Sequence, residues 1–149
     1  MGHEAAAGVK ALRANLAGDT TLVALVSTRI YAESAPQDAA YPFVVMRQRS
    51  PGDDSQVLYP KRSMTSPLFD VGIWVQDDPY STAAQSGAKR IDVALGSLAH
   101  YSVTDANSDV WEVSAQREGG AWVREEVDLK TMKKFYWIGG SYRLSISAA

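Results

Sequence analysis

The sequence predicts a single α+β domain over residues 1–149, with a mostly antiparallel sheet packed by one long central helix and an N-terminal helical pair. Residues 4–17 repeat apolar side chains at helical spacing. Residues 69–76 alternate apolar and polar side chains, as a strand with one buried face does. A second helical stripe starts near position 80 and is followed by more strand-like segments, an order typical of α+β domains.

The N-terminal part is predicted to be a helical pair that leads into a strand. A helix is expected over 4–17, because helix formers dominate there and Gly18 follows. Asp19 has the side chain and position of an N-cap for a second short helix. Arg29 opens an extended segment, and residues 1–8 are expected to be frayed.

Two central strands follow from alternation. The first covers 43–49 and has apolar residues on both sides until Arg47. The second covers 69–76, where the odd positions from 69 to 75 form a core face and Trp74 stands on the opposite face. Together they predict the centre of the sheet.

The central helix is predicted to begin at Asp77–Asp78–Pro79, because an acidic N-cap there would precede proline at the first helical position. Apolar residues at 80, 84, 87, 91, 94, 95 and 98 then share one stripe. We expect this helix to end within residues 99–101.

Two strands are predicted in the C-terminal part. A polar turn over 104–109 precedes a strand over 110–117, and Gly119–Gly120 is interpreted as a turn or a bulge. In the final strand the even positions from 136 to 146 are largely apolar and share a face. Gly139–Gly140 in its middle predicts a bulge or a sharp twist.

Residues 50–67 are predicted to form a long loop that is functional or mobile, since prolines, serines and charges gather there. A second charged stretch covers residues 119–133. The candidate contact residues of the first loop are Asp53, Asp54, Tyr59, Lys61 and Arg62, and those of the second are Arg124, Glu125 and Glu126.

Composition argues against several classes of protein. The chain has 46% hydrophobic and 21% charged residues, which is typical of globular domains. With 15 Lys+Arg against 17 Asp+Glu, its net charge of -2 argues against nonspecific DNA binding. No cysteine is present to form a disulfide, a thiolate metal site or a thiol nucleophile. No apolar run approaches the roughly 20 residues of a membrane helix, and the start lacks a signal-peptide pattern, so we expect the protein to stay where it is made.

Residues capable of catalysis are few and poorly placed. His3 lies near the terminus and His100 at the expected helix end. Adjacent acids on a strand point to opposite faces, so the paired acids do not predict a carboxylate dyad. The glycine pairs lack the context of a phosphate-binding loop. We therefore expect no catalytic residue, metal or cofactor.

Two tryptophans are candidate interface residues. If helices cover one face of the sheet, the other face still carries Trp74 and, we expect, Trp111. Exposed apolar surface of this kind usually marks an interface, so the pattern predicts self-association.

Taken in order, these segments resemble the tail-completion or tail-terminator proteins of long-tailed bacteriophages. The resemblance covers about residues 9–147. It rests on the helix around 9–16, the segments 22–26, 29–31, 35–37 and 41–45, and the strand 69–76 that runs into the helix from Tyr80.

The resemblance implies a non-enzymatic structural protein in the neck of a siphophage virion, assembled in the host cytoplasm. Such subunits form a ring, expected to be a hexamer, on the head-proximal end of the tail tube. The ring stops polymerisation of the tube protein and joins the tail to the head-completion (stopper) protein of the connector. DNA passes through its lumen without specific binding, and neither a membrane nor a cofactor is involved. We infer that the two charged loops contact tube or connector.

Two other functions stay open. A small carboxylate-dependent enzyme would need two converging acids with strongly shifted pKa values. An oligonucleotide-binding module would use Tyr59, Lys61 and Arg62, and its retention of DNA would fall steeply with salt.

Overall fold

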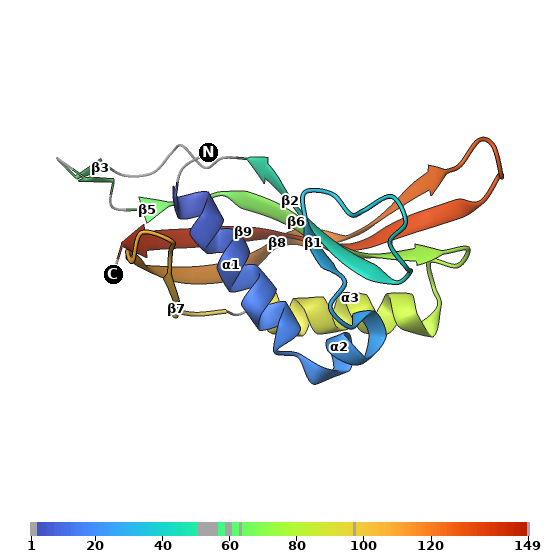
Figure 1. The fold of residues 1–149 in the computed structure, drawn as a ribbon, viewed down its shortest axis with the longest axis horizontal. Helices are drawn as coiled ribbons and strands as arrows, with labels where there is room; N and C mark the ends of the chain where they lie inside the picture. The colour runs from blue at the N-terminus through green and yellow to red at the C-terminus, as the bar shows by residue number, and fades with distance from the viewer. Residues whose placement is uncertain (1–2, 51–56, 59–60, 63, 97, 149) are drawn as a thin grey trace.

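Three helices lie on one face of a curled sheet in the computed structural model, which describes residues 3–50, 57–58, 61–62, 64–96 and 98–148 (Figure 1). The α+β class is therefore confirmed. The elements are α1 (His3–Ala17), α2 (Thr20–Val26), β1 (Ile30–Ala32), β2 (Phe43–Ser50), β3 (Val57–Leu58), β4 (Lys61–Arg62), β5 (Met64–Thr65), β6 (Leu68–Gln76), α3 (Thr82–Leu95), β7 (Tyr101–Thr104), β8 (Val110–Val127) and β9 (Lys134–Ala148).

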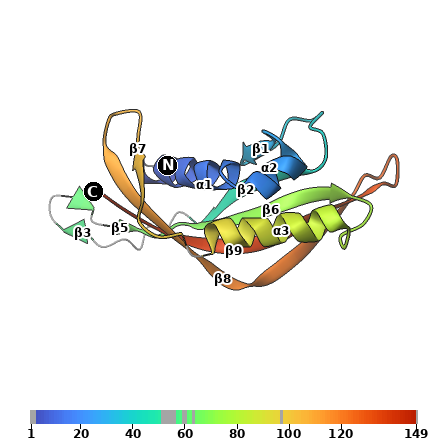
Figure 2. The ribbon, with the colours of Figure 1, turned by 90° about the horizontal axis from the view of Figure 1, so that it is seen from below.

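The described strands form a seven-stranded sheet in the order β1-β2-β6-β9-β8-β7, with β5 paired to the end of β9. Every pair is antiparallel except β1 with β2, which is parallel. Strands β3 and β4 form a separate two-stranded ladder. Figures 1 and 2 show α3 lying along β6 and β9, with α1 and α2 beside it.

The main core fills the space between the helices and one face of the sheet. Close approach is possible because small residues stand at the contacts: a Cβ at Gly8 of α1 would lie 2.9 Å from Leu144 Cδ1, and one at Gly87 of α3 would overlap Ile73. Buried Tyr142 of β9 reaches α3, where its hydroxyl donates to Asp92 Oδ1 at 3.0 Å. Burial and the nearby carboxylate raise the pKa of Tyr142.

The N-terminal expectations are mostly confirmed. Asp19 caps α2, since Leu22 N donates to its Oδ1 at 2.9 Å. Helix α1 already includes His3, and Ala5 and Ala7 are buried. The prediction that residues 1–8 are frayed is therefore wrong for residues 3–8. The cause is the contact of α1 with the sheet, which outweighs the usual fraying of a chain end.

The start and end of the central helix differ from the prediction. Ser81 is the N-cap of α3 and accepts from Ala84 N at 3.2 Å. Asp77 instead takes a left-handed φ of 67°, and Asp78 accepts from Tyr80 N in the turn after β6. The helix ends at Leu95 rather than within 99–101, although Leu98 still packs on the core from the following segment.

Strand β7 was not predicted. It lies over Tyr101–Thr104, and within it only Val103 is buried. So short a strand leaves no alternation to recognise, and it is stabilised by pairing with the first residues of β8. His100, which precedes it, has a φ of 51° and lies outside the helix.

Of the turn or bulge predicted at Gly119–Gly120, the turn is wrong, because β8 runs through these residues, and the bulge is confirmed. Glu118 pairs with Ser141 and Trp122 pairs with Gly139, so β8 advances four residues here while β9 advances two. The extra residues form a bulge in β8. The chain reverses later, where Met132 N donates to Asp128 O. The predicted bulge at Gly139–Gly140 is also wrong, because both residues pair in register with β6. A Cβ at Gly139 would overlap the carbonyl oxygen of Val71, so glycine there permits close strand approach.

The predicted loop 50–67 contains the last residue of β2, Ser50, which pairs with Leu68, and the short strands β3, β4 and β5. Residues 51–56, 59, 60 and 63 lie outside the described residues. Within the described ranges, no helix has the length and apolar run needed to cross a membrane.

Candidate functional site

The sheet face turned away from the helices carries a groove with an aromatic floor. Phe43, Trp74 and Trp137 are register neighbours on β2, β6 and β9. The rings of Trp74 and Trp137 are stacked with centroids 5.9 Å apart. Tyr41 and Phe135 also stack, at 5.2 Å. These side chains line a cavity of about 710 Å³, which we call the aromatic groove.

The walls of the aromatic groove come from two separate segments. One is the stretch 33–36 after β1, and the other is 126–130 at the end of the β8–β9 hairpin. Acidic residues on these walls, among them Glu33 and Glu126, stand beside the apolar floor. Burial raises the pKa of the Tyr41 hydroxyl, and the charge of Glu126 adds to this effect.

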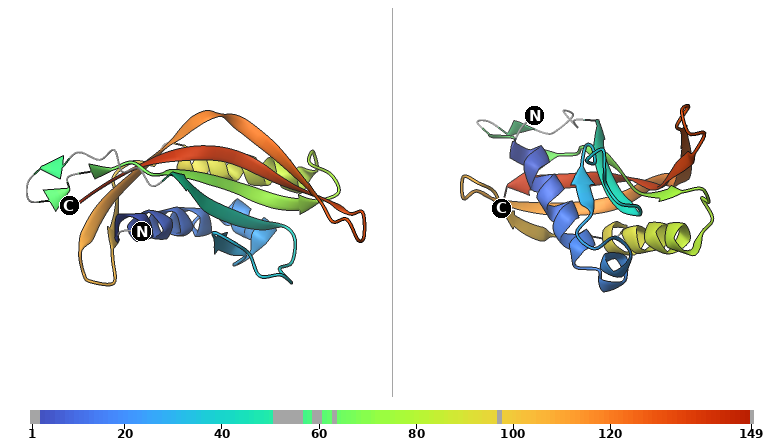
Figure 3. Two further views of the ribbon diagram at one scale, coloured as in Figure 1. Left: turned by 90° about the horizontal axis from the view of Figure 1, so that it is seen from above. Right: turned by 45° about the vertical axis from the view of Figure 1, so that its right-hand side comes forward.

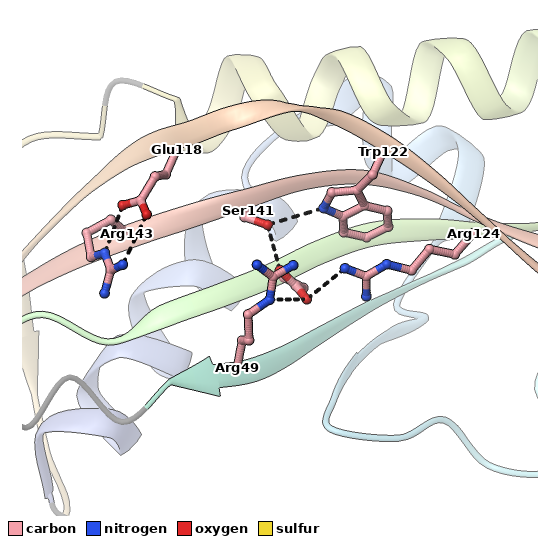
Figure 4. Close-up of polar contacts among 7 residues, drawn as sticks. Arg49, Glu118, Trp122, Arg124, Ser141 and Arg143 are labelled. Atoms are coloured by element: carbon pink, nitrogen blue, oxygen red, sulfur yellow. Dashed lines mark hydrogen bonds and ion pairs between the residues drawn. The ribbon is translucent and has the colours of Figure 1, made fainter.

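A buried carboxylate lies beside the groove and holds four strands together. Asp70 of β6 is 5% exposed. Arg49 Nε donates to its Oδ2 at 3.1 Å, and Arg124 Nη2 donates to the same oxygen at 3.2 Å. Ser141 Oγ donates to Oδ1 at 2.7 Å. In Figure 4 the side chains of Arg49, Arg124 and Ser141 lie on the near side of the strands with the helices behind, so the cluster belongs to the open face.

Tryptophan side chains extend this cluster. Trp122 Nε1 donates to Ser141 Oγ at 3.2 Å. The Arg124 guanidinium lies 4.2 Å from the Trp122 ring centroid and 5.2 Å from that of Trp137, both within cation–π range. Arg124 is thereby held in place by the carboxylate and by two aromatic rings, of which Figure 4 draws that of Trp122.

A second cleft of about 290 Å³ adjoins the aromatic groove. It is lined by Arg47, Gln48, Arg49, Asp70, Arg124 and Trp137. Arg47 and Trp137 line both cavities, so the two are neighbours on the open face. Three arginines stand against one aspartate here, and Arg47 makes no ion pair within the described part of the chain. This end of the open face therefore has an excess of positive charge.

A further ion pair borders the cluster. Arg143 donates to Glu118 through Nε at 2.9 Å and through Nη2 at 3.1 Å. These hydrogen bonds lower the pKa of the Glu118 carboxyl. Arg143 Nη1 also donates to Ser66 O, which fixes the segment before β6 to β9.

The predicted interface tryptophans lie on opposite faces. Trp74 lines the aromatic groove as a half-buried residue. Trp111 packs against the main core on the helix side, and its Nε1 donates to Asp105 Oδ2 at 3.0 Å. The prediction that the two tryptophans share one face of the sheet is therefore wrong. Trp111 shares the side of Val113 and Ala115, which point into the core.

The predicted contact residues are dispersed. Asp53, Asp54 and Tyr59 lie outside the described residues, whereas Lys61 and Arg62 form β4. Arg124, Glu125 and Glu126 belong to β8 and pair with β9, so they are not in a loop. The prediction that these three residues lie in a loop is therefore wrong, and their role as contacts stays a prediction.

Sequence reasoning missed Asp70, Ser141 and Phe43 as site residues. A signal for Asp70 was present, because it shares the side of Trp74 in the alternating strand. Nothing local pointed to Ser141, whose partner Asp70 is 71 residues away.

The carboxylates that line the aromatic groove are those of Glu33, Glu126 and Asp128. Asp70 is surrounded by arginines and Ser141. His100 and Glu112, 3.7 Å apart, are both well exposed. Among the described residues, no group of three or more potential ligands is placed to hold a metal ion. The arrangement offers binding surface and gives an enzyme hypothesis no specific support.

Comparison with solved structures finds a similar fold. The fold resembles that of a virion chain. That chain belongs to a structure titled "Virion of native gene transfer agent (GTA) particle", with a TM-score of 0.56 and 19% identity. The alignment covers 99% of this chain and 100% of the other. At this identity the likeness is one of fold.

Other comparisons add little. A second solved chain has a TM-score of 0.49 and 10% identity over 95% of this chain and 96% of its own length, values too low to support an inference. No protein-family model matches the sequence, and no curated protein matches it significantly.

Proposed function

We propose that this chain is a structural protein of a phage-like virion. More specifically, it is the subunit of a ring that caps the head-proximal end of a tail tube, stops tube polymerisation and joins the tail to the head connector. The observation that carries the proposal is the fold shared with the gene transfer agent virion chain, because the alignment extends over nearly the whole of both chains.

The open face supports a role in assembly. Its aromatic floor and arginine-rich cleft have no covering element within the described part of the chain. Monomeric proteins seldom leave such apolar surface exposed unless it binds something. A subunit that contacts copies of itself and neighbouring virion proteins would cover it.

The proposed partners follow from this role. They are further copies of the chain in a ring, which we expect to be hexameric, the tail tube protein and the head-completion or stopper protein. DNA would pass through the lumen without specific binding, as the net charge of -2 favours. The protein would thus be part of the neck of a siphophage-like virion assembled in the host cytoplasm, without catalytic activity or cofactor.

The contacts with tube and connector are assigned to two regions. One is the segment 50–67, with Asp53, Asp54, Tyr59, Lys61 and Arg62. The other is the hairpin that carries Arg124, Glu125 and Glu126, all exposed. Exposed charges at the edge of an interface chiefly guide orientation and partner choice.

Electron microscopy tests the proposal directly. Purified protein is imaged alone and after incubation with tail tubes from particles that lack this protein, and its mass is measured by light scattering. We expect closed rings, on their own or at one end of each tube, and tubes that no longer elongate when tube protein is added. A protein that never assembles and leaves tube elongation unchanged contradicts the proposal.

A DNA-retention assay separates the remaining alternative. An oligonucleotide-binding module would hold single-stranded DNA tightly at low salt and lose it steeply as salt rises. We expect weak retention that does not depend on Lys61 and Arg62, measured by comparing the unmodified chain with a Lys61→Ala/Arg62→Ala variant.

A further inference from the structure

The arginine-rich cleft on the open face is lined mostly by hydrogen-bond donors. Arg47, Arg49 and Arg124 contribute guanidinium groups, which donate hydrogen bonds and accept none. The carboxylate of the lining is that of Asp70. Arg124 comes from the strand that continues into the β8–β9 hairpin, which extends beyond the helical layer (Figures 1 and 3). A cleft with this balance suits a ligand that brings acceptors and negative charge.

The Asp70 carboxylate is already occupied. Its Oδ2 accepts from Arg49 Nε at 3.1 Å and from Arg124 Nη2 at 3.2 Å. Its Oδ1 accepts from Ser141 Oγ at 2.7 Å and lies 3.1 Å from Arg49 Nη2. Both oxygens therefore have partners, whereas each arginine uses only part of its guanidinium on Asp70. Asp70 fixes the two arginines and leaves them with donors for another acceptor.

Two further donors of the cleft have no partner among the described residues. Arg47 is exposed and makes no ion pair with any of them. The indole Nε1 of Trp137 is buried and has no hydrogen-bond partner there. Because buried donors in native proteins are rarely left unpaired, an acceptor from outside the chain is expected at this nitrogen.

The indole nitrogen of Trp137 lies on the cleft side of its ring. A Cβ at Gly72 would be 2.7 Å from Nε1. Gly72 stands between Trp74 and Asp70 on the open side of β6. Since Trp74 is the register partner of Trp137, the N–H is displaced from that pair toward Asp70. Trp137 and Arg47 can thus donate into the same cleft.

The surroundings of the cleft favour a protein carboxylate over the phosphates of a nucleic acid. The cleft of about 290 Å³ is at the small end of ligand pockets, with room for a side chain. Carboxylates stand on either side of it, since Glu33 and Glu126 line the neighbouring aromatic groove and Glu118 pairs with Arg143. Nucleic-acid binders instead carry Lys and Arg along a continuous stripe. A planar carboxylate also matches the fork of a guanidinium.

We propose that the arginine-rich cleft binds the carboxylate of an Asp or Glu side chain from a neighbouring protein in the assembly. The carboxylate accepts hydrogen bonds from Arg47 and from Trp137 Nε1, while Arg49 and Arg124 add positive charge. The proposal rests on the proposed function and names the chemistry of the partner surface that covers this part of the open face.

A titration followed by NMR tests the site on the isolated chain, at a concentration where light scattering finds the monomer. The probe is a short peptide in which glutamate alternates with glycine, and the control peptide has glutamine instead of glutamate. The chain has four tryptophans, and the indole N–H signal of Trp137 is assigned by its loss in Trp137→Phe. We expect the glutamate peptide to move this signal downfield, as a new hydrogen bond does, and to leave that of Trp111 unchanged. The glutamine peptide should move neither.

An arginine variant tests the contribution of the cleft. Arg47→Ala removes donors that have no ion-pair partner in the described part of the chain, so the fold should stay intact while the affinity for the glutamate peptide falls about tenfold. Arg13→Ala, which removes an exposed arginine from α1, is the matched control and should bind as the unmodified chain does. Urea denaturation compares the stability of the two variants. Equal affinity of both variants for the peptide would overturn the proposal.

Two other probes distinguish the source of the anion. Inorganic phosphate and a single-stranded oligonucleotide are titrated in the same way, and we expect both to bind more weakly than the glutamate peptide. If either moves the Trp137 signal at a lower concentration than the peptide does, or if no probe moves it, a protein carboxylate is the wrong ligand.

The outcomes separate this proposal from the proposed function, because the titrations need no ring and no tube. If the chain caps tubes but its cleft binds no glutamate peptide, the carboxylate site is wrong while the ring function stands. If the peptide binds as expected but the chain forms no ring and caps no tube, the ring function fails while the carboxylate site is retained.

Discussion

The two faces of the sheet differ in what covers them. On the helix side, side chains such as Phe69, Ile73 and Leu144 are fully buried in one continuous core beneath three helices. On the open side Phe43, Val45 and Trp137 form a smaller buried cluster, and half-buried aromatics surround it. Both faces are rich in large apolar side chains, but only one is completed by its own chain.

This difference indicates two roles for apolar residues. Those on the helix side stabilise the fold, because burial there needs no partner. Those on the open side stabilise the monomer less and gain more when another chain covers them. Substitutions on the two faces test this division.

Leu144→Ala should cause the greatest loss of stability. Leu144 is fully buried between β9 and α1, so its removal leaves a cavity and costs about 2–5 kcal/mol of unfolding free energy. Urea denaturation followed by circular dichroism measures this. A loss below about 1 kcal/mol would mean that the helix side is loosely packed, which would contradict the difference between the two faces of the sheet.

Asp70→Asn should be the most damaging polar change on the open face. The substitution removes the charge that Arg49 and Arg124 share. Breaking a fully buried ion pair costs about 3–5 kcal/mol, and because both arginines are partly exposed we expect about 2 kcal/mol. The same denaturation assay applies, with exposed Asp38→Asn as the control. Equal stability of the two variants would show that the cluster contributes little to folding.

Trp74→Ala should weaken the monomer less than Leu144→Ala despite the larger side chain. It removes the stacked contact with Trp137, and such aromatic pairs contribute about 0.5–1.5 kcal/mol beyond their buried area. Because the residue is only half buried, assembly should suffer more than folding. Light scattering and urea denaturation on the same sample compare the two effects, and intact assembly would argue against an interface at the groove.

Asp19→Asn gives the smallest effect and a defined pH dependence. Two nitrogens of Arg90 donate to the Asp19 carboxylate, and these hydrogen bonds lower its pKa below the ordinary 3.8. The carboxylate is therefore deprotonated more readily in the folded than in the unfolded chain. Its stabilisation is present above about pH 4 and is lost as the pH falls through the lowered folded value.

Asparagine keeps the N-cap but not the charge, so the variant should lose about 1 kcal/mol at pH 7. The difference from the unmodified chain should shrink as the pH falls below 4. Thermal unfolding between pH 2 and pH 7 measures this dependence. A difference that stays constant over that range would show that the ion pair between α2 and α3 does not stabilise the fold.

Local pattern was a good guide where one face of an element is buried. Phe69–Val75 was correctly predicted as a strand with its odd positions in the core, and Asp19 was correctly identified as a cap. Both depend on neighbours within a few residues. The start of α3 was predicted wrongly because Asp77, Asp78 and Ser81 all have side chains suited to an N-cap. The left-handed backbone at Asp77 delays the helix, so that Ser81 becomes the cap.

The candidate site was less predictable. Trp74 was placed correctly on the face away from the core, but nothing in the sequence joined it to Trp137, Phe43 or the Asp70 cluster. Gly119–Gly120 has the sequence of a turn, yet β8 passes through it because pairing with β9 resumes at Trp122. Register between distant strands therefore decided where Arg124 and Glu126 lie.

The sequence alone determined the fold class, the central strands and the cysteine-free, slightly acidic composition, since these follow from periodicity and residue counts. Only the tertiary structure decided which side chains form the aromatic groove, that Trp111 belongs to the core, and that the second charged segment is a projecting hairpin. The physical reason is that helical and strand periods are local properties of the chain. Strand pairing and the choice of the face that the helices cover depend on contacts between residues far apart in sequence.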